Sequence, residues 1–96
     1  MSRPPRFKFR LYVAADTQNS VRATANLNAF CRDHLLNRHE IEVVDVLREP
    51  KRAMADAIFM TPTLVKLVPV PIRRLVGTLS QPQLLQETIG LEATPA

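Results

Sequence analysis

The chain has 96 residues, 46% of them hydrophobic and 23% charged, which is typical of one globular domain. No apolar run approaches the ~20 residues of a membrane-spanning helix, and no apolar segment of a secretion signal follows the N-terminal arginines. A single cysteine cannot form an internal disulfide, which fits a reducing cytoplasm. We therefore predict one cytoplasmic domain over residues 1–96, with a flexible basic arm at 1–6 and a tail at 91–96.

The net charge of +4 originates at the N-terminus. Four of the 13 Lys and Arg residues lie among the first ten positions, namely Arg3, Arg6, Lys8 and Arg10. From residue 11 onward, nine cations balance nine acids. Because short basic arms are commonly solvated, the charge pattern does not favour nucleic acid as a partner.

The first half of the chain predicts a strand, a helix and a second strand. Residues 7–13 alternate apolar and basic side chains and then become continuously apolar, as in a strand that becomes buried on both faces. From about residue 20 to 36, one helical face is apolar: Ala23, Leu27, Phe30, Cys31 and Leu35. Residues 40–47 alternate again, and a helical crossover would make them a parallel partner of the first strand.

The second half predicts a short helix, a hairpin and a last helix. Pro50 can occupy the first position of a helix over residues 51–59, whose buried face would be Ala53, Met54, Ala57 and Ile58. Residues 63–68 and 72–76 are apolar runs that predict two strands joined at Pro69-Val70-Pro71. Residues 78–82 form a capped start to the last helix, with Leu84, Leu85 and Ile89 on its apolar face and Gly90 at its end.

The prolines of this hairpin restrict where it can lie. Proline lacks an N–H and fixes φ, so Pro62, Pro69 and Pro71 must stand at strand starts, at the turn or on an edge. Pro62, directly before a strand, is a candidate for a cis bond. An apolar hairpin that also carries prolines and cations is expected to form an exposed surface rather than part of the buried core.

The predicted order β-α-β-α-β-β-α, with a parallel first pair and an antiparallel hairpin, is the thioredoxin-like arrangement, and Thr61-Pro62 stands where that fold carries a cis-proline. Where a thioredoxin has Cys-x-x-Cys, at the start of the first helix, this chain has Thr17-Gln18-Asn19-Ser20. Disulfide exchange requires a thiolate and a partner thiol. We therefore expect no redox enzyme.

The remaining chemical groups favour structural roles. Cys31 is expected in the core, because free cysteine is among the most buried residue types. His34 and His39 have no further ligand at metal-binding spacing and are expected at the surface. Asp45, inside a strand pattern, is expected at an exposed strand end or as a local cap rather than as a catalytic group. No enzyme activity, metal or cofactor is predicted.

Several segments carry a resemblance when they are taken together. They are Leu11-Tyr12-Val13-Ala14, residues 19–23, residues 44–47 with Pro50, and the block 61–77 with its Thr-Pro-Thr-Leu, Pro-x-Pro and Arg-Arg-Leu-Val-Gly elements. Their order and spacing resemble the KaiB family of circadian-clock proteins over about residues 7–80. From Gln81 onward the chain departs from that family, and the acidic tail typical of clock versions is missing.

The resemblance implies a non-enzymatic regulatory protein that docks on the hexameric ATPase ring of KaiC in clock or stress-response signalling. KaiA and a SasA-type kinase would be further partners where they are present. Members of this family also re-form their C-terminal half into an alternative ground-state packing. The resemblance thus places Pro62, Pro69 and Pro71 in a fold-switching segment. In that family the alternative state assembles as tetramers, but because the acidic tail is missing here, the resemblance leaves open both self-association as a dimer or tetramer and which fold is the resting one.

Carried over position by position, the resemblance assigns partner contacts to basic residues: Lys8, Arg22, Lys66, Arg73 and Arg74. We expect them to meet acidic residues of the ring, since arginine pairs bidentately with carboxylates. For Lys8, a solvated cationic face is an equal alternative. The alternative function is a thioredoxin-like adaptor with an unrelated partner, comparable to a SasA-type sensor domain.

Overall fold

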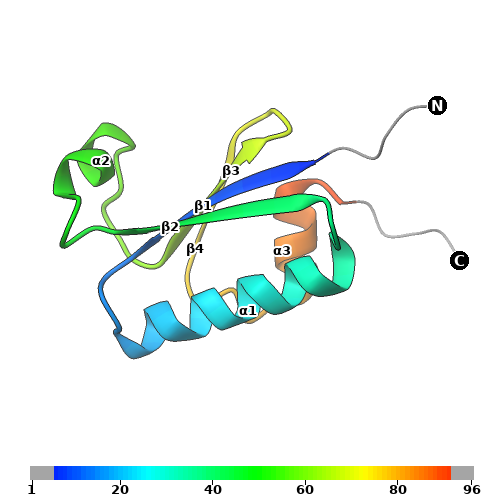
Figure 1. The fold of residues 1–96 in the computed structure, drawn as a ribbon, viewed down its shortest axis with the longest axis horizontal. Helices are drawn as coiled ribbons and strands as arrows, with labels where there is room; N and C mark the ends of the chain where they lie inside the picture. Colours follow the sequence, from blue (N-terminus) through cyan, green and yellow to red (C-terminus); the bar gives the residue numbers. More distant parts are fainter. Residues whose placement is uncertain (1–5, 92–96) are drawn as a thin grey trace, which may run out of the picture.

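The computed structural model describes residues 6–91 and confirms the predicted order of elements (Figure 1). These are β1 (Phe7–Val13), α1 (Gln18–His34), β2 (His39–Asp45), α2 (Pro50–Ala55), β3 (Thr63–Val68), β4 (Arg73–Val76) and α3 (Pro82–Ile89). Residues 1–5 of the predicted basic arm and 92–96 of the predicted tail lie outside the described residues.

The four strands form one sheet in the order β2-β1-β3-β4. β1 runs parallel to β2 and antiparallel to β3, and β3 runs antiparallel to β4. Leu11 in the middle of β1 lies opposite Val43 of β2 and Leu64 of β3. This is the parallel pair and antiparallel hairpin that the sequence predicts.

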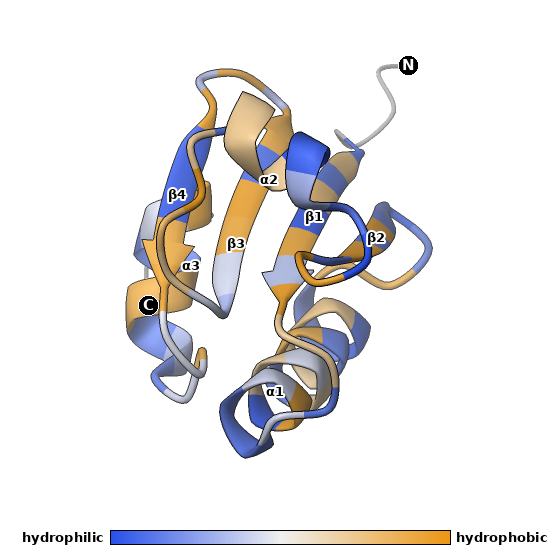
Figure 2. Cartoon of the chain, turned by 90° about the vertical axis from the view of Figure 1, so that its left-hand side faces the viewer, coloured by the Kyte–Doolittle hydropathy of each residue, from blue (hydrophilic) through white to orange (hydrophobic). Residues whose placement is uncertain are grey.

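Helices cover both faces of this sheet, because its central strands carry apolar side chains on each side. The larger core cluster joins alternate residues of β1, among them Phe9 and Leu11, to α1 and α3. A smaller cluster on the opposite face joins Tyr12, Val44 and Val65 to Ala53 of α2. Figure 2 shows the resulting alternation of hydrophobic and hydrophilic bands along β1. We call these the α1/α3 face and the α2 face of the sheet.

The short helix differs from the prediction, which extended it to Phe59. α2 ends at Ala55, and Ala57 follows in the left-handed region with φ of 54°. The side chain of Asp56, just after the helix, accepts hydrogen bonds from Tyr12 and Arg10, which fix the chain against the sheet. Ala53 is buried and Ile58 is partly buried, but Met54 is 79% exposed and Ala57 is also exposed, so the predicted face was wrong at these two positions.

The other boundaries agree with the prediction within a few residues. β4 begins at Arg73 and leaves Ile72 exposed, and Leu84 of α3 is also exposed, although the sequence placed it on the apolar face. Gly90 ends α3 in the left-handed conformation, as predicted, with φ of 85°. Within residues 6–91, no helix has the length and apolarity needed to cross a membrane.

Candidate partner-binding surface

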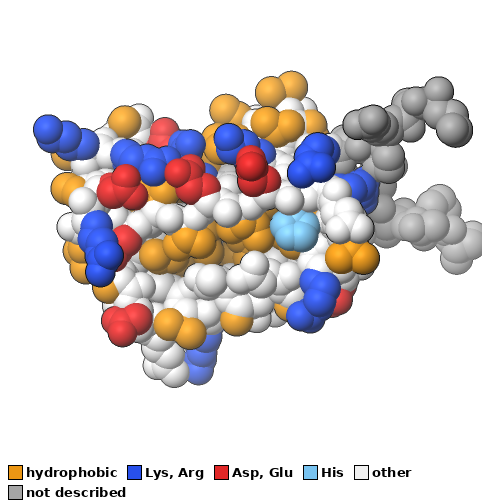
Figure 3. Space-filling model, in the orientation of Figure 1, with side chains coloured by type: hydrophobic (Ala, Val, Ile, Leu, Met, Phe, Trp, Pro, Cys, Tyr) orange, Lys and Arg blue, Asp and Glu red, His pale blue; other side chains and the backbone are white. Residues whose placement is uncertain are grey.

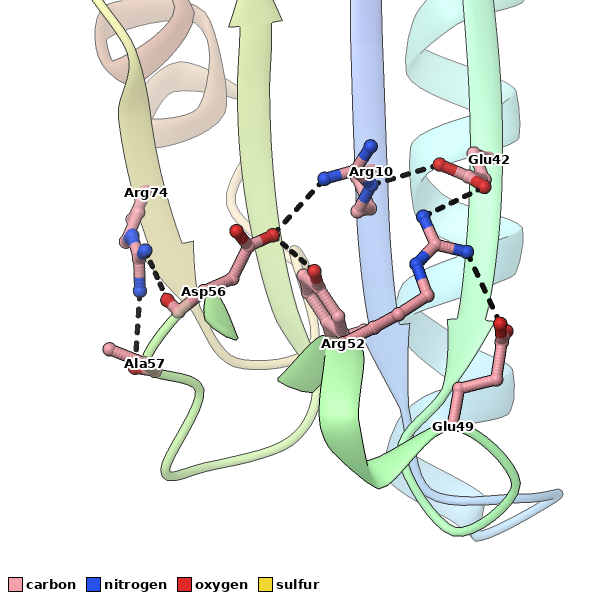
Figure 4. Close-up of polar contacts among 8 residues, drawn as sticks. Arg10, Glu42, Glu49, Arg52, Asp56, Ala57 and Arg74 are labelled. Carbon is pink, nitrogen blue, oxygen red and sulfur yellow. Dashed lines mark hydrogen bonds and ion pairs between the residues drawn. The ribbon is translucent and has the colours of Figure 1, made fainter. Parts of the chain in front are cut away.

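The predicted basic residues of the hairpin point to opposite faces of the sheet. In the β3–β4 register, Arg74 lies opposite Val65, which belongs to the core under α2, whereas Arg73 lies opposite Lys66. The guanidinium of Arg74 donates to the backbone carbonyls of Asp56 and Ala57, the latter at 3.2 Å (Figure 4). Because successive side chains of a strand point to opposite faces of the sheet, Arg73 and Arg74 lie on different surfaces.

Lys66 is buried in this fold. Only 4% of the residue is exposed, and its Nζ donates to the carbonyl oxygen of Ile89 at the end of α3, at 3.2 Å. Burial lowers the pKa of Lys66, and the positive charge of Arg73 lowers it further. Its predicted contact with a partner stays a prediction, and in this fold the partner would have to reach it from the α3 side.

Lys8 and Arg22 lie on different sides of the molecule. Lys8 stands on the α2 face of β1, with its Nζ 3.8 Å from Glu40 in the paired position of β2. Arg22 is exposed on α1. The five predicted cations therefore do not form a single cluster: Lys8 and Arg74 belong to the α2 face, and Arg22, Lys66 and Arg73 to the side of α1 and α3.

A paired network occupies the α2 face near the predicted cations (Figure 4). Arg10 of β1 donates to Glu42 of β2 at 2.9 Å and to Asp56 at 3.1 Å. Arg52 of α2 lies 2.9 Å from the second oxygen of Glu42. Tyr12 donates to the same oxygen of Asp56 that Arg10 contacts. The network ties α2 to both parallel strands.

These contacts hold the acids of the network ionised. The hydrogen bond from Tyr12, and then that from Arg10, lower the pKa of Asp56. The hydrogen bonds from Arg10 and Arg52 lower the pKa of Glu42. A carboxylate with a lowered pKa and fixed cationic partners is a poor general acid or base near neutral pH. The arrangement suits structural support of α2.

The start of α1, where a thioredoxin carries its thiols, is occupied by hydroxyl and amide side chains. Ser20 is buried and accepts hydrogen bonds from the backbone N–H of Ala14 at 3.0 Å and from the Thr17 hydroxyl at 2.8 Å. Cys31 is fully buried, as predicted, and burial raises its pKa to about 12. Because the thiolate is the reactive form, this thiol is inert at neutral pH.

The other groups that the sequence singled out also have structural roles. Asp45 is a local cap, as predicted: its Oδ1 accepts from the N–H groups of Ala15 and Leu47 at 3.1 and 2.9 Å. His34 is exposed, and its ring lies tilted by 33° against that of Phe30, with the centroids 4.5 Å apart. His39 is half-buried and contacts the carbonyl oxygen of Leu35. The described part of the chain contains no group of three or more metal-ligating side chains.

The three hairpin prolines all follow cis peptide bonds, Thr61-Pro62, Val68-Pro69 and Val70-Pro71. Pro62 is buried directly before β3, as expected for a proline at a strand start. Pro69 and Pro71 lie in the β3–β4 turn, where the missing N–H interrupts no strand pairing. Their predicted place in a fold-switching segment stays a prediction.

Sequence reasoning missed an exposed apolar surface beside α2. Phe59 is 91% exposed, and Met54, Met60 and Val76 are also exposed. Phe59, Met60 and Val76 border one shallow pocket together with Arg74. We call these four apolar residues the Phe59 patch. One signal was present in the sequence: Ile58-Phe59-Met60 has three consecutive large apolar residues, which cannot all face one core.

A second apolar feature lies between β2 and α1. Val21 and Val43 are half exposed and line a groove together with Ala25 and Val13. Figure 3 shows hydrophobic side chains in a band below the row of charged groups. Exposed apolar side chains therefore lie in two places, beside α2 and between β2 and α1.

The fold and the start of α1 together define the class: a thioredoxin-like domain without a cysteine pair. The SasA N-terminal domain of Synechococcus elongatus has this fold, with a TM-score of 0.75 and 16% identity over 100% of this chain and 94% of that chain. Chloroplastic thioredoxin z matches with a TM-score of 0.73 and 17% identity over 88% and 76%. The thioredoxin-like prediction is confirmed.

Sequence comparison then identifies the family within that class. The KaiB domain model matches residues 10–96, and the chain belongs to the KaiB family. The circadian clock oscillator protein KaiB of Thermostichus vulcanus is 40% identical over 91% of this chain and 87% of its own length. The circadian clock protein KaiB3 of a Synechocystis species is 34% identical over 94% and 86%. The family match extends to the C-terminus, beyond the residue 80 limit expected from the sequence.

Proposed function

We propose that this chain is a non-enzymatic regulatory protein that docks, in its thioredoxin-like state, on a KaiC-type ATPase ring. The family match over residues 10–96 carries the proposal. A relative that is 40% identical over 91% of this chain bears the name circadian clock oscillator protein KaiB. Clock or stress-response signalling is the output that the family implies.

The chemistry of the fold supports binding rather than catalysis. Thr17 to Ser20 supply no thiol at the start of α1, and Cys31 is both buried and held protonated. The charged groups of the α2 face are paired with one another. By contrast, Phe59 and Arg73 are exposed and available to a partner.

The test is size-exclusion chromatography with light scattering on this chain mixed with the KaiC-type ATPase of the same source, in ATP and in ADP. Samples are read after minutes and after hours. A ring complex is the expected result. Complex formation within minutes would mean that the chain rests in the binding fold, whereas formation over hours would support a change of fold first. The free chain in the same experiment reports its self-association.

A pair of charge reversals on α1 sharpens this test. Arg22→Glu changes a predicted contact, and Arg32→Glu changes an exposed arginine of the same helix, whose ion pair among the described residues is with its neighbour Asp33. Weaker binding of Arg22→Glu alone supports the assigned contact. Equal binding of both variants would remove Arg22 from the interface, and absence of any complex for the unmodified chain would overturn the proposed function.

A thioredoxin-like adaptor with an unrelated partner is the second candidate. The match of the entire chain to the SasA N-terminal domain favours it, because that structure is a domain of the same fold. The two candidates separate in the same experiment, since an adaptor of this kind would form no ring complex under either nucleotide.

A further inference from the structure

Three sulfur atoms belong to the residues that the structure describes, those of Cys31, Met54 and Met60. Cys31 is fully buried in the larger core cluster, whereas the two methionines are 79% and 64% exposed. Burial also holds the Cys31 thiol protonated, because it raises the pKa to about 12. Oxidation of sulfur depends on exposure and, for a thiol, on thiolate character. Within residues 6–91, an oxidant in solution therefore meets the two thioethers first.

Both methionines are held at the surface by a hydrogen-bonded backbone. The carbonyl oxygen of Met54 accepts from the N–H of Ala57 at 3.0 Å. The carbonyl oxygen of Met60 accepts from the Thr63 hydroxyl at 2.6 Å. The side chains of Met54 and Met60 belong to neither core cluster. Oxidation of these side chains is therefore expected to change the surface of the chain and to leave the fold intact.

A hydrogen-bond donor lies beside Met60. Met60 and Arg74 border the same shallow pocket. The hydrogen bonds of Arg74 to described residues, at the backbone carbonyls of Asp56 and Ala57, use two of the five N–H donors of its guanidinium. A thioether sulfur is a weak acceptor, whereas the oxygen of a sulfoxide carries a strong negative partial charge. The pocket can therefore accommodate the polar, oxidised form of Met60 as well as its apolar form.

We propose that Met54 and Met60 form a reversible oxidation site, at which hydrogen peroxide makes the Phe59 patch polar without unfolding the chain. The thioether sulfur attacks one peroxide oxygen, the O–O bond breaks and an S–O bond forms. The second oxygen leaves as hydroxide and takes the proton of the first to form water, so the sulfur loses two electrons and the peroxide gains them. A dithiol methionine sulfoxide reductase reverses the step, with formation of a disulfide and water.

Oxidation changes two of the four side chains of the Phe59 patch. Apolar contact with the patch becomes less favourable, because an oxygen that is buried without a hydrogen bond costs free energy. Arg74 can supply that bond to Met60, and the sulfoxide sulfur is a stereocentre. One epimer therefore directs its oxygen toward the guanidinium better than the other, and we expect the two epimers to form unequally at Met60. The site goes beyond the proposed function and is independent of ring docking.

The first experiment is a peroxide time course on the folded chain, with N-acetylmethionine amide in the same solution as the reference thioether. Mass spectrometry of proteolytic peptides follows each sulfur separately. We expect Met54 and Met60 to oxidise at rates within about tenfold of the reference, while Cys31 stays unmodified until urea unfolds the chain. A slower rate at either methionine, or earlier oxidation of Cys31, would overturn the site.

The second experiment measures the polarity of the surface by hydrophobic-interaction chromatography, after catalase has removed the peroxide. The oxidised chain should elute earlier than the untreated chain, with the same midpoint of urea unfolding. Treatment with methionine sulfoxide reductases should restore the original elution. Unchanged elution after oxidation, a lower urea midpoint, or no recovery with the reductases would each contradict the proposal.

A double variant is the matched control for this experiment. Met54→Leu combined with Met60→Leu conserves the apolar volume and has no thioether at these two positions. Its elution should be the same before and after peroxide. Because Met1 and Cys31 are present in both chains, an equal shift of both would assign the effect to other residues and overturn the site.

The third experiment measures the epimer ratio of Met60 sulfoxide, from the fraction that each epimer-specific reductase removes. Arg74→Gln removes the charged donor from the pocket, whereas Arg73→Gln, its neighbour on the opposite face of the sheet, is the control. We expect a ratio of about threefold or more in the unmodified chain and in Arg73→Gln, and a ratio near one in Arg74→Gln. Protection of Cys31 from oxidation shows that each variant remains folded. The same ratio in all three chains would remove Arg74 from the site.

Discussion

The two halves of this domain are stabilised in different ways. Residues 6–45, which contain β1, α1 and β2, supply nine of the thirteen residues of the larger core cluster. Residues 46–91 supply four, yet they carry nine of the twelve large apolar side chains that are exposed. Apolar packing stabilises the first half, whereas most of the exposed large apolar side chains belong to the second half.

Polar contacts attach the second half to the first and to itself. Asp56 is bonded to Arg10 and Tyr12 of β1, Arg74 to backbone carbonyls after α2, and Lys66 to the end of α3. Regions with few buried apolar contacts open at lower free energy than the packed core. The comparison indicates that the second half is easier to rearrange, and it is the half in which the KaiB resemblance places the fold change.

The largest expected effect concerns apolar packing. Leu27→Ala in α1 should lower the free energy of unfolding by about 2–5 kcal/mol, because it removes a fully buried side chain of the larger cluster. Urea denaturation measures this loss. Leu85→Ala in α3 is the counterpart in the second half. Hydrogen exchange should show that Leu85→Ala weakens protection mainly in α3, and uniform loss across β1 and α1 would contradict the division into halves.

The next effect is a pH dependence of the free energy of unfolding, which reports how well the core of the first half excludes water from Cys31. Burial raises the pKa of Cys31 from 9.0 to about 12, so the unfolded chain loses this proton first as the pH rises. The stability due to this group is present below pH 9 and is lost toward pH 12, with a limiting slope of ~1.4 kcal/mol per pH unit.

Cys31→Ala should flatten this alkaline decline in urea unfolding measured at several pH values. Tyr12 also has a raised pKa and acts in the same direction, whereas Lys66 has a lowered pKa and acts in the opposite one. The comparison of the variant with the unmodified chain therefore isolates the thiol. An unchanged slope would mean that Cys31 is accessible to water in the folded chain.

A smaller effect should come from the polar attachment of the second half. Asp56→Asn weakens the bonds from Arg10 and Tyr12, and we expect a loss of about 1–3 kcal/mol at pH 7. Because the folded pKa of Asp56 is lowered, its contribution exists above the usual ~3.9 and disappears as the pH falls through the folded value. The difference between variant and unmodified chain should therefore shrink in acid. Asp33→Asn, an exposed acid of α1, is the control.

The smallest effect is expected for Lys8→Gln. Lys8 and Glu40 are well exposed and 3.8 Å apart, and such pairs contribute ~0.2–1 kcal/mol. Thermal unfolding at low and at high salt should show little change. A loss comparable to that of Asp56→Asn would indicate that polar contacts also hold the first half together.

The sequence predicted the fold well where hydrophobic periodicity is strong. The apolar face of α1 and the β3 run from Thr63 to Val68 are found as expected, because most of their apolar side chains are buried in the core, although Val68 at the end of β3 is exposed. α2 was predicted too long, since the bonds of Asp56 to β1 come from residues more than forty positions away. Local propensity does not contain such contacts.

The candidate site was harder to predict. The resemblance supplied the five cations, but only the strand register shows that Arg73 accompanies Lys66 while Arg74 faces α2. The burial of Lys66 and the exposure of Phe59 both depend on where α3 and the segment after α2 pack, which no local pattern reveals. Residue identity gave the charges, and tertiary packing decided which of them are accessible.

Because Arg73 and Arg74 are neighbours in β4 but face opposite sides of the sheet, their position affects how the phenotypes of variants in this segment are interpreted. Reversing both charges in a single variant would combine a change on the α1/α3 face with a change in the attachment of the segment after α2, so its phenotype could not be assigned to either surface. Insertion or deletion of one residue in the Val68–Arg73 connection could have a similar effect, because a shift of β4 by one position against β3 exchanges the faces of its side chains. The length of this turn is therefore as much a determinant of surface chemistry as the identity of the two arginines.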